Sequence, residues 1–412
     1  MPIRTPHSRN ISSHSRSNIF QAVRRFGRKT PLLINAPWLI TVVLLLPTFS
    51  RLDADESNLT ASPTDYFAEV QDLTPEGDQL IQREVADGKF STALKSFVLP
   101  NENTQALPIP ILDRFTTVNA FKLSHSGLVV GFAVRSLGHP QGSQRAFVWN
   151  WKTDKLEALH PPALFRDSCA FDISADGSVV SGFIVGRDPP RVIPCVWQRR
   201  ADDWICQLLP TVAMYNPFLS AGRVVISDDG RSAAASVAKN DEQDGSGNQL
   251  RIWRRDKAGR WQGRNATDSA VHLANINNQS MVVGRVTQRG KRMGFVYEPN
   301  TGVSLLKPLP GDASTTVTDV NNQGIAIGIS DDPPGPNGGS TAFRWSLKTR
   351  ELEPIEFDRK EIFSTARTID DQNRIGGWLA WQSKDLGDSV KAGAYLLRPT
   401  QPNLHTPKAN QE

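Results

Sequence analysis

The sequence AFKLSHSGLVVG, residues 120–131, sets a pattern that the chain repeats five more times. Each copy is an apolar run, a polar turn and a second apolar run. The other copies are AFDISADGSVVSG at 170–182, RVVISDDGRSAAA at 223–235, LANINNQSMVVG at 273–284, VTDVNNQGIAIG at 317–328 and ARTIDDQNRIGG at 366–377. The turn residues of successive copies lie 44 to 53 residues apart, a period typical of repeat architectures.

The chemistry of these turns predicts β-hairpins. Ser, Asn or Asp opens each turn, where its side chain can accept a bond from a main-chain N–H two residues further on. Gly stands three residues later in four copies, at the position that most needs a positive φ. The flanking runs are apolar on both faces, which indicates strands buried on both sides. Glycines such as Gly131 and Gly328 end the second strand, where we expect two backbones to approach closely.

Two further strands complete each unit. The third carries a Trp or Tyr in nearly every copy, and the segments are AFVW at 146–149, PCVW at 194–197, LRIW at 250–253, GFVY at 294–297, AFRW at 342–345 and GAYL at 393–396. The fourth is represented by LEALH at 156–160, ICQLLP at 205–210, VSLLKPLP at 303–310 and LEPIEF at 352–357. Four antiparallel strands per unit predict an all-β protein, a six-bladed β-propeller.

The sixth unit ends at Leu397–Pro399 without a fourth strand. Residues 97–100 and 107–112, ahead of the first unit, resemble the missing strand. We therefore expect an N-terminal strand to complete the last blade and close the ring, because closure removes exposed strand edges. Before it, Thr74-Pro75-Glu76 places an N-cap, a first-turn proline and an acidic residue in order, which predicts one short helix.

The N-terminal region predicts export. Residues 1–50 carry seven Lys or Arg and no Asp or Glu, and they end in the apolar run Trp38–Leu46. Such a short run behind a basic region is typical of a signal peptide, and an uncleaved anchor formed by residues 31–50 is the alternative. Both place the protein in the periplasm or outside the cell. The predicted domains are this leader (1–50), an acidic linker with the short helix (51–93), the propeller (94–399) and a disordered tail (400–412).

At this point the repeats resemble the bacterial extracellular repeat family that is named for its His-Ala-Phe motif. The matching stretches are 276–284 and 320–328 for the hairpin half, and Ala146–Trp149 and Ala342–Trp345 for the aromatic strand. The resemblance covers about residues 118–399, and the motif's His is replaced in every unit. It implies an exported repeat protein and implies no catalytic residues.

Charge and residue spacing exclude several classes of function. Without the leader, residues 51–412 carry a formal charge of −2, so the basic surface of a nucleic-acid binder is missing. The seven histidines show no metal-site spacing, and no nucleophile motif or phosphate loop is present, so we predict no metal, no cofactor and no catalytic residue. Cys195 and Cys206 lie opposite each other if Trp197 pairs with Trp204, which predicts a disulfide and leaves Cys169 as a small buried thiol.

One column of polar residues marks a candidate site. Five residues before the turn position, on the strand expected nearest the axis, stand Lys122, Asp172, Val225, Asn275, Asp319 and Thr368. We predict that the polar members form a mixed-charge ring around the central channel, which either holds a small ligand or ion or lines a water-filled channel. The longer connections at 239–249 and 330–341 are the other candidate binding elements.

The sequence favours a non-catalytic binding or scaffold propeller of the cell envelope. We expect a monomer that presents its loop face to an envelope protein or a glycan and contacts the membrane only through its N-terminal segment. The alternative is an exported hydrolase or lyase that uses Asp172 and Asp319 of the channel as acid and base or as metal-binding groups. The ligand, the fate of the leader and the oligomeric state stay open.

Overall fold

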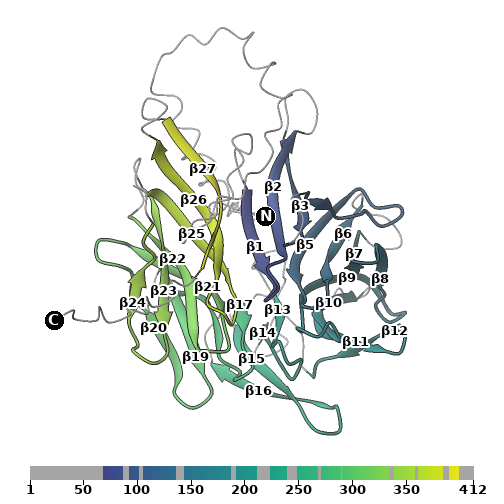
Figure 1. Ribbon diagram of the computed structural model, residues 1–412. Coiled ribbons are helices and arrows are strands. Elements are labelled where there is room, and N and C mark those ends of the chain that lie inside the picture. Colours follow the sequence, from purple (N-terminus) through teal and green to yellow (C-terminus); the bar gives the residue numbers. More distant parts are fainter. Residues whose placement is uncertain are drawn as a thin grey trace, which may run out of the picture.

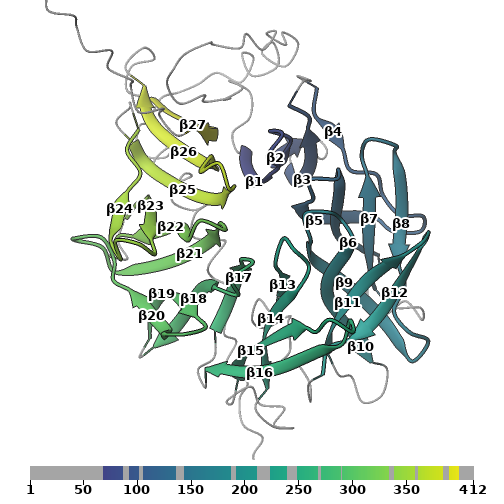
Figure 2. The same cartoon turned by 60° about the horizontal axis from the view of Figure 1, so that its bottom comes forward.

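The computed structural model describes residues 68–86, 92–101, 105–135, 143–186, 192–210, 223–238, 248–267, 271–288, 290–333, 338–357, 361–383 and 389–398. All regular structure in these ranges is β-strand. The strands form seven antiparallel sheets that stand radially around a central axis (Figures 1 and 2). The chain is therefore an all-β propeller. Over the same ranges, no helix is long and apolar enough to cross a membrane.

The first four blades follow one another along the chain. Their strands are β1 (Ala68–Leu73), β2 (Gln79–Ala86), β3 (Thr92–Leu99) and β4 (Leu107–Pro108); β5 (Thr117–Leu123), β6 (Leu128–Val134), β7 (Gln144–Asn150) and β8 (Lys155–Leu159); β9 (Phe165–Ile173), β10 (Val179–Gly186), β11 (Val192–Arg200) and β12 (Asp203–Leu208); and β13 (Val224–Ile226), β14 (Ser232–Ala238), β15 (Asn248–Arg255) and β16 (Trp261–Thr267).

The last three blades continue in the same order. Their strands are β17 (Val271–Ile276), β18 (Val282–Gln288), β19 (Lys291–Glu298) and β20 (Gly302–Leu306); β21 (Ser314–Val320), β22 (Ile325–Asp331), β23 (Ser340–Ser346) and β24 (Leu352–Pro354); and β25 (Glu361–Ile369), β26 (Ile375–Ser383) and β27 (Ser389–Leu397). Within each blade the first strand lies nearest the axis (Figure 2).

The prediction of six blades was wrong, because residues 68–108 form a complete blade of their own. The short helix predicted at Thr74-Pro75-Glu76 was also wrong. These residues make the β1–β2 turn, in which Gly77 N–H donates to Thr74 O (2.9 Å) and Gly77 has a φ of +98°. The same residue types cap helices and open turns, so this turn was assigned to the predicted linker.

The N-terminal strand expected to close the ring does not lie in the last blade. Residues Thr92–Leu99 and Leu107–Pro108 are β3 and β4, which pair with β2 and with each other. Blades 1 and 7 meet face to face instead, with β1 packed against β25, β26 and β27. Among the described residues, the first blade strand thus begins at Ala68, inside the range 51–93 predicted as linker. The leader (1–50) and the tail (400–412) lie outside the described residues.

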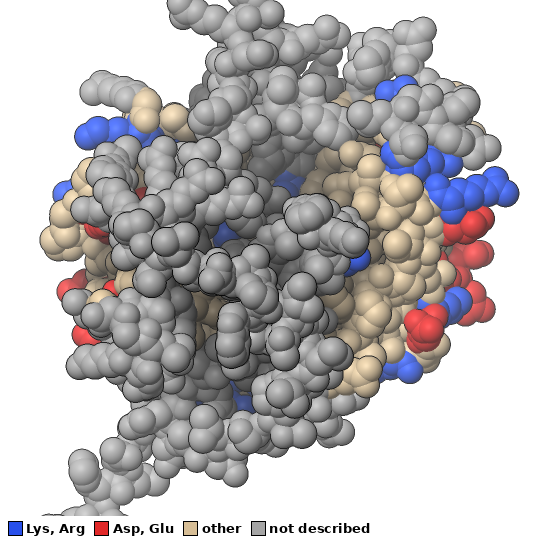
Figure 3. Space-filling model, turned by 90° about the horizontal axis from the view of Figure 1, so that it is seen from above, with Lys and Arg blue, Asp and Glu red and all other residues tan. Residues whose placement is uncertain are grey.

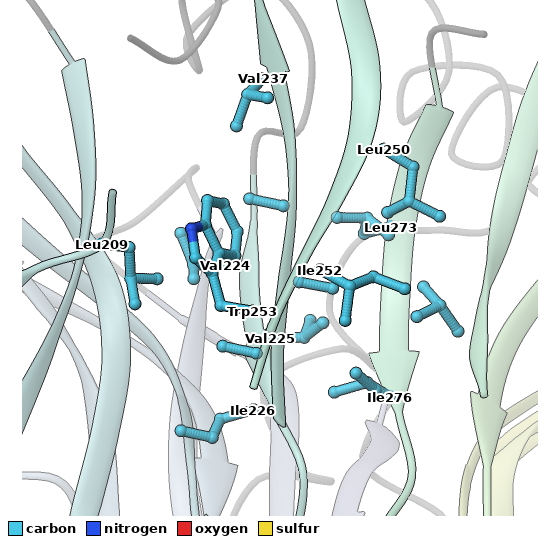
Figure 4. Packing of buried hydrophobic residues seen from close by; sticks show 14 of the residues in the cluster. Leu209, Val224, Val225, Ile226, Val237, Leu250, Ile252, Trp253, Leu273 and Ile276 are labelled. Atoms are coloured by element: carbon cyan, nitrogen blue, oxygen red, sulfur yellow. The ribbon is translucent and has the colours of Figure 1, made fainter. Parts of the chain in front are cut away.

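The predicted aromatic anchors are confirmed. Trp253 is fully buried and packs beside Val224 and Leu209, at the junction of blades 3 and 4 (Figure 4). Its indole N–H donates to Pro210 O of the preceding blade (3.0 Å), and Trp197 makes the equivalent bond to His160 O (3.2 Å). The third strands of blades 3 and 4 therefore contribute an apolar side chain whose one polar atom is bonded to the preceding blade, whereas the Trp149 indole of blade 2 donates to Asp154 of its own blade (3.0 Å).

The predicted close approach at the second-strand glycines is also confirmed. The first strand carries a β-bulge opposite Gly328, between Val317 and Asp319. A Cβ atom at Gly328 would lie 2.1 Å from Thr316 O, so only glycine fits there. Bulges of this kind aim a particular side chain, and in this blade the aimed residue is Asp319.

Candidate ligand site in the central channel

The structure places the polar column around the central channel. Lys122, Asp172, Asn275 and Asp319 line cavities on the axis, and Thr368 bonds to another residue of the same ring. In all five of these blades a register shift directly precedes the ring residue; in blade 5, for example, it lies between Leu273 and Asn275. The bulge turns the ring residue out of its sheet. The geometry of the predicted ring is therefore present, while its role in ligand binding stays a prediction.

The ring has a seventh member that the sequence interpretation missed. Asp72, on β1, is 2% exposed and lines the same channel. It stands five residues before the turn glycine Gly77, which is the spacing of the other ring positions. This spacing could have identified Asp72 from the sequence. The segment was instead interpreted as a linker, because it is acidic and because Thr74-Pro75-Glu76 resembles a helix cap.

The three aspartates of the ring hold neighbouring blades together. One carboxylate oxygen of Asp72 accepts the N–H of Leu123 in blade 2 (2.6 Å). Asp172 accepts the N–H of Ile226 in blade 4 (2.9 Å), and Asp319 accepts that of Ile369 in blade 7 (2.9 Å). Each carboxylate thus joins its own blade to the first strand of the next blade. Hydrogen bonds to charged acceptors are stronger than hydrogen bonds between neutral groups, so these contacts stabilise the interfaces between neighbouring blades.

Lys122 supplies the positive charge of the ring. Its ammonium group donates to Asp72 Oδ1 (3.0 Å), the oxygen that also accepts the hydroxyl of Thr368 (3.2 Å). Burial opposes the charged form of Lys122, but the carboxylates of Asp72, Asp319 and Asp172 outweigh burial and raise its pKa well above the usual value. Lys122 is therefore a permanent cation inside the ring.

The two remaining ring carboxylates have perturbed acidities. Burial raises the pKa of Asp172 to about 7, although the charge of Lys122 and the N–H of Ile226 favour its ionised form. Burial likewise raises the pKa of Asp319, against the attraction of Lys122 and a hydrogen bond from the Asn275 amide. Asp172 thus exchanges a proton near neutral pH.

Two chambers meet at the ring. The chamber on the side of the tight turns has about 510 Å³ of space and the one on the loop side about 380 Å³, and both volumes include the solvent at their open mouths. Lys122 and Asn275 line both. On the turn side, Asn322 donates to Asp228 and to Asp371 (both 2.9 Å), so turns from three blades are joined around the opening.

The loop-side chamber combines aromatic and polar groups. The rings of Phe121 and Phe171 lie 5.2 Å apart, and the guanidinium of Arg223 lies 5.3 Å from the Phe121 ring centre. Arg367, on the same wall, donates to Glu69 (2.6 Å). Figure 3 looks onto this face, and Lys and Arg side chains are visible near its centre, between the grey atoms. Sequence reasoning missed this set because its members come from separate repeats, each with an unremarkable local sequence.

Other candidate groups are not assembled into a site. In the described ranges, no group of three or more His, Cys, Asp or Glu could hold a metal ion. The connection 239–249 lies almost entirely outside these ranges, and 330–341 lies partly outside them.

The predicted hairpin register of the cysteines was wrong by two residues. Trp197 lies opposite Cys206 and not opposite Trp204. All three cysteines are free thiols in the structure. Burial, with a hydrogen bond that the thiol donates to Cys206, raises the pKa of Cys195 well above its usual value. The two sulfurs are thus neighbours on one face of the hairpin, so their disulfide stays a prediction for the oxidised protein. Cys169 is a buried thiol, as predicted.

The acidity of Asp172 makes stability depend on pH. Between about pH 4 and pH 7 the folded protein holds a proton that the unfolded chain has released, because the folded pKa is the higher of the two. The stabilisation is therefore complete below pH 4 and is lost as the pH rises through 7. We expect the stability of Asp172→Asn, relative to the native protein, to rise between pH 5 and pH 8. Urea unfolding at several pH values measures this, with exposed Asp203→Asn as control. Parallel curves for the two proteins would contradict the assignment.

A radial ring of seven β-sheets around a channel with a charged ring defines the class, a seven-bladed β-propeller. No protein-family model and no curated protein sequence matches the chain. Among solved structures, it is similar to the β-propeller domain of the Trilobed protease from Pyrococcus furiosus, with 10% identity, a TM-score of 0.50 and coverage of 83% of this chain and 98% of that one.

Two peptidases show the same likeness. The acylaminoacyl peptidase of Pyrococcus horikoshii gives 11% identity and a TM-score of 0.51, covering 80% of this chain and 51% of that one. A puromycin-hydrolyzing peptidase of Mycobacterium tuberculosis gives 13% identity and a TM-score of 0.51, covering 85% and 56%. The chain thus spans about half the length of these two peptidases. At such identities the likeness shows the propeller fold alone.

Proposed function

We propose that this protein is a non-catalytic, exported binding propeller of the cell envelope, whose loop-side chamber takes the end of an envelope glycan. An envelope protein docked on the same loop face is the other partner that the sequence favours. The export of the chain is part of the proposal and rests on the basic, apolar leader at residues 1–50. Its relation to the His-Ala-Phe repeat family rests on the repeated motifs and is likewise proposed.

One observation carries this proposal: the carboxylates of the channel already accept hydrogen bonds from the main chain, while the chamber beside them keeps partly exposed side chains. The carboxylates that a hydrolase would need are occupied, since Asp172 and Asp319 each accept two main-chain N–H groups. The chamber above them offers partly exposed faces of Phe121 and Phe171 beside Arg223. A few polar groups next to apolar faces are typical of small-ligand sites.

A hydrolase or lyase is the second candidate, and a single observation favours it. Asp172 has a pKa of about 7 and lines the loop-side chamber, so it can accept and donate a proton near neutral pH. A catalytic role requires that turnover be lost in Asp172→Asn while binding is kept. The binding proposal requires that the native protein leave its ligand unaltered.

Binding of envelope glycan fragments tests the proposal. The full chain is titrated with a panel of muropeptides and oligosaccharides by calorimetry, and the recovered ligand is analysed by mass spectrometry. We expect Phe121→Ala or Arg223→Ala to weaken binding at least about tenfold, because each removes a wall of the chamber. Leu164→Ala, whose side chain is on the surface, serves as the control. Binding unaffected by both chamber variants, or a cleaved ligand, would reject the non-catalytic chamber site.

A further inference from the structure

The negative groups of the loop-side chamber are almost completely buried. Its two carboxylates, Asp172 and Asp319, are each 4% exposed, and each of their oxygens accepts a main-chain N–H. Because burial raises the pKa of Asp172 to about 7, this carboxyl group is partly protonated at neutral pH. The negative groups therefore offer a ligand little accessible surface and a reduced charge.

The positive groups of the same chamber are more accessible. The side chain of Arg367 is 35% exposed and that of Lys122 is 22% exposed, and Arg223 is half-buried. Arg367 donates through Nε to Glu69 (2.6 Å), and in the described part of the chain no acceptor is bonded to its two terminal nitrogens. A ligand that enters from the loop side therefore meets accessible positive charge, while the carboxylates lie beneath.

An aromatic wall orients one of these cations. The guanidinium of Arg223, which directly precedes β13 of blade 4, lies over the Phe121 ring of blade 2 at 5.3 Å from its centre. The Phe171 ring of blade 3 lies 5.2 Å from that of Phe121. A guanidinium that lies over an aromatic face directs its N–H groups sideways, in a fork that matches the two oxygens of a carboxylate. The wall thus places a carboxylate-binding group beside two apolar ring faces.

Accessible arginines beside exposed aromatic faces specify the chemistry of the ligand. We propose that the loop-side chamber takes an acidic sugar, whose carboxylate is bound by Arg223 and Arg367 while its apolar face packs on Phe121 and Phe171. This inference rests on the proposed glycan-binding function and names the class of glycan. The muramic acid of peptidoglycan and the uronic acids of polysaccharides both carry such a carboxylate.

Two matched pairs of sugars test the inference. The first pair is the disaccharide of N-acetylglucosamine and N-acetylmuramic acid against chitobiose, and the second is cellobiouronic acid against cellobiose. In each pair only the first member carries a carboxylate. The full chain is titrated with all four sugars by calorimetry at pH 7. We expect the acid of at least one pair to bind at least about tenfold more tightly than its neutral counterpart, and that pair identifies the source of the ligand.

Charge-removing variants assign the carboxylate to the two arginines. Arg223→Gln and Arg367→Gln are each expected to reduce the ratio of acid to neutral affinity to less than about threefold, because the bulk of the wall stays while a cation is lost. Phe121→Ala is expected to weaken both members of a pair by the same factor, since both use the ring face. Arg344→Gln, on the exposed surface of blade 6, is the control and is expected to leave the ratio unchanged.

The outcomes separate this inference from the proposed function. Equal affinity for the two members of both pairs would overturn the acidic ligand and leave glycan binding intact. A preference for the acid that neither arginine variant reduces would overturn the assignment of its carboxylate to Arg223 and Arg367. If Arg367→Gln fails to fold, because it leaves Glu69 buried without its cation, Arg223→Gln decides the assignment. Binding of none of the four sugars would count against the glycan function itself.

Discussion

Replacing Asp72 with alanine is expected to lower the free energy of unfolding by about 3–5 kcal/mol, the usual result of removing one partner from a buried ion pair. The carboxylate of Asp72 accepts bonds from Lys122, Thr368 and the N–H of Leu123, so its loss strands a cation and a main-chain donor in the channel. Chemical denaturation measures the change.

Two matched variants make this prediction specific. Glu353→Ala removes one partner of the exposed Arg344–Glu353 pair (2.8 Å) and is expected to cost less than about 1 kcal/mol. The double variant Asp72→Ala/Lys122→Met is expected to be more stable than Asp72→Ala alone, because the stranded charge is gone. If Asp72→Ala costs no more than Glu353→Ala, the ring is not an energetic core of the propeller.

Gly328→Ala is expected to destabilise the protein by about 3 kcal/mol or more, because the new methyl group would overlap the Thr316 carbonyl. The position that a Cβ would take is 2.1 Å from that oxygen, and the oxygen is a main-chain atom of a paired strand, which shifts less easily than the end of a flexible side chain. The consequence extends to the channel, since the bulge opposite Gly328 is the one that aims Asp319.

Gly302→Ala is the control for Gly328→Ala. Gly302 has a φ of +82° but nothing within 4 Å of its would-be Cβ, so alanine there meets backbone strain without overlap. Its expected cost is about 1–2 kcal/mol. Thermal melts of both variants, or their soluble yields if Gly328→Ala fails to fold, distinguish the two effects. Equal losses in both variants would show that the bulge has room for a side chain.

The repeating blades could be predicted because the sequence features that mark them are local and recur at the same positions of each repeat. Turn residues, second-strand glycines and the third-strand tryptophans each follow from the short-range geometry of a hairpin. Blade 1 was not predicted because its second strand, QLIQREVA, has neither the glycine nor the small apolar run of the other copies. With Asp72 in that blade, the ring was predicted with one member missing.

The hydrogen-bond partners of the ring residues could not be predicted from the sequence, for a different reason. A column of polar residues predicts a shared location but not the partners of each atom. That Asp172 bonds to the next blade and Lys122 to the previous one depends on the rotation from blade to blade. The hairpin register at Trp197 failed for a related reason, because a slip of two residues keeps every side chain on the same face. Pattern alone does not separate two such registers.

The position of Lys122 between the two chambers determines how solutes meet this molecule. A propeller axis runs from one face of the molecule to the other, and here the ion pair between Lys122 and Asp72 lies where the two chambers meet. A solute that moves from one chamber to the other would pass this pair, and a charged solute would compete with its two partners.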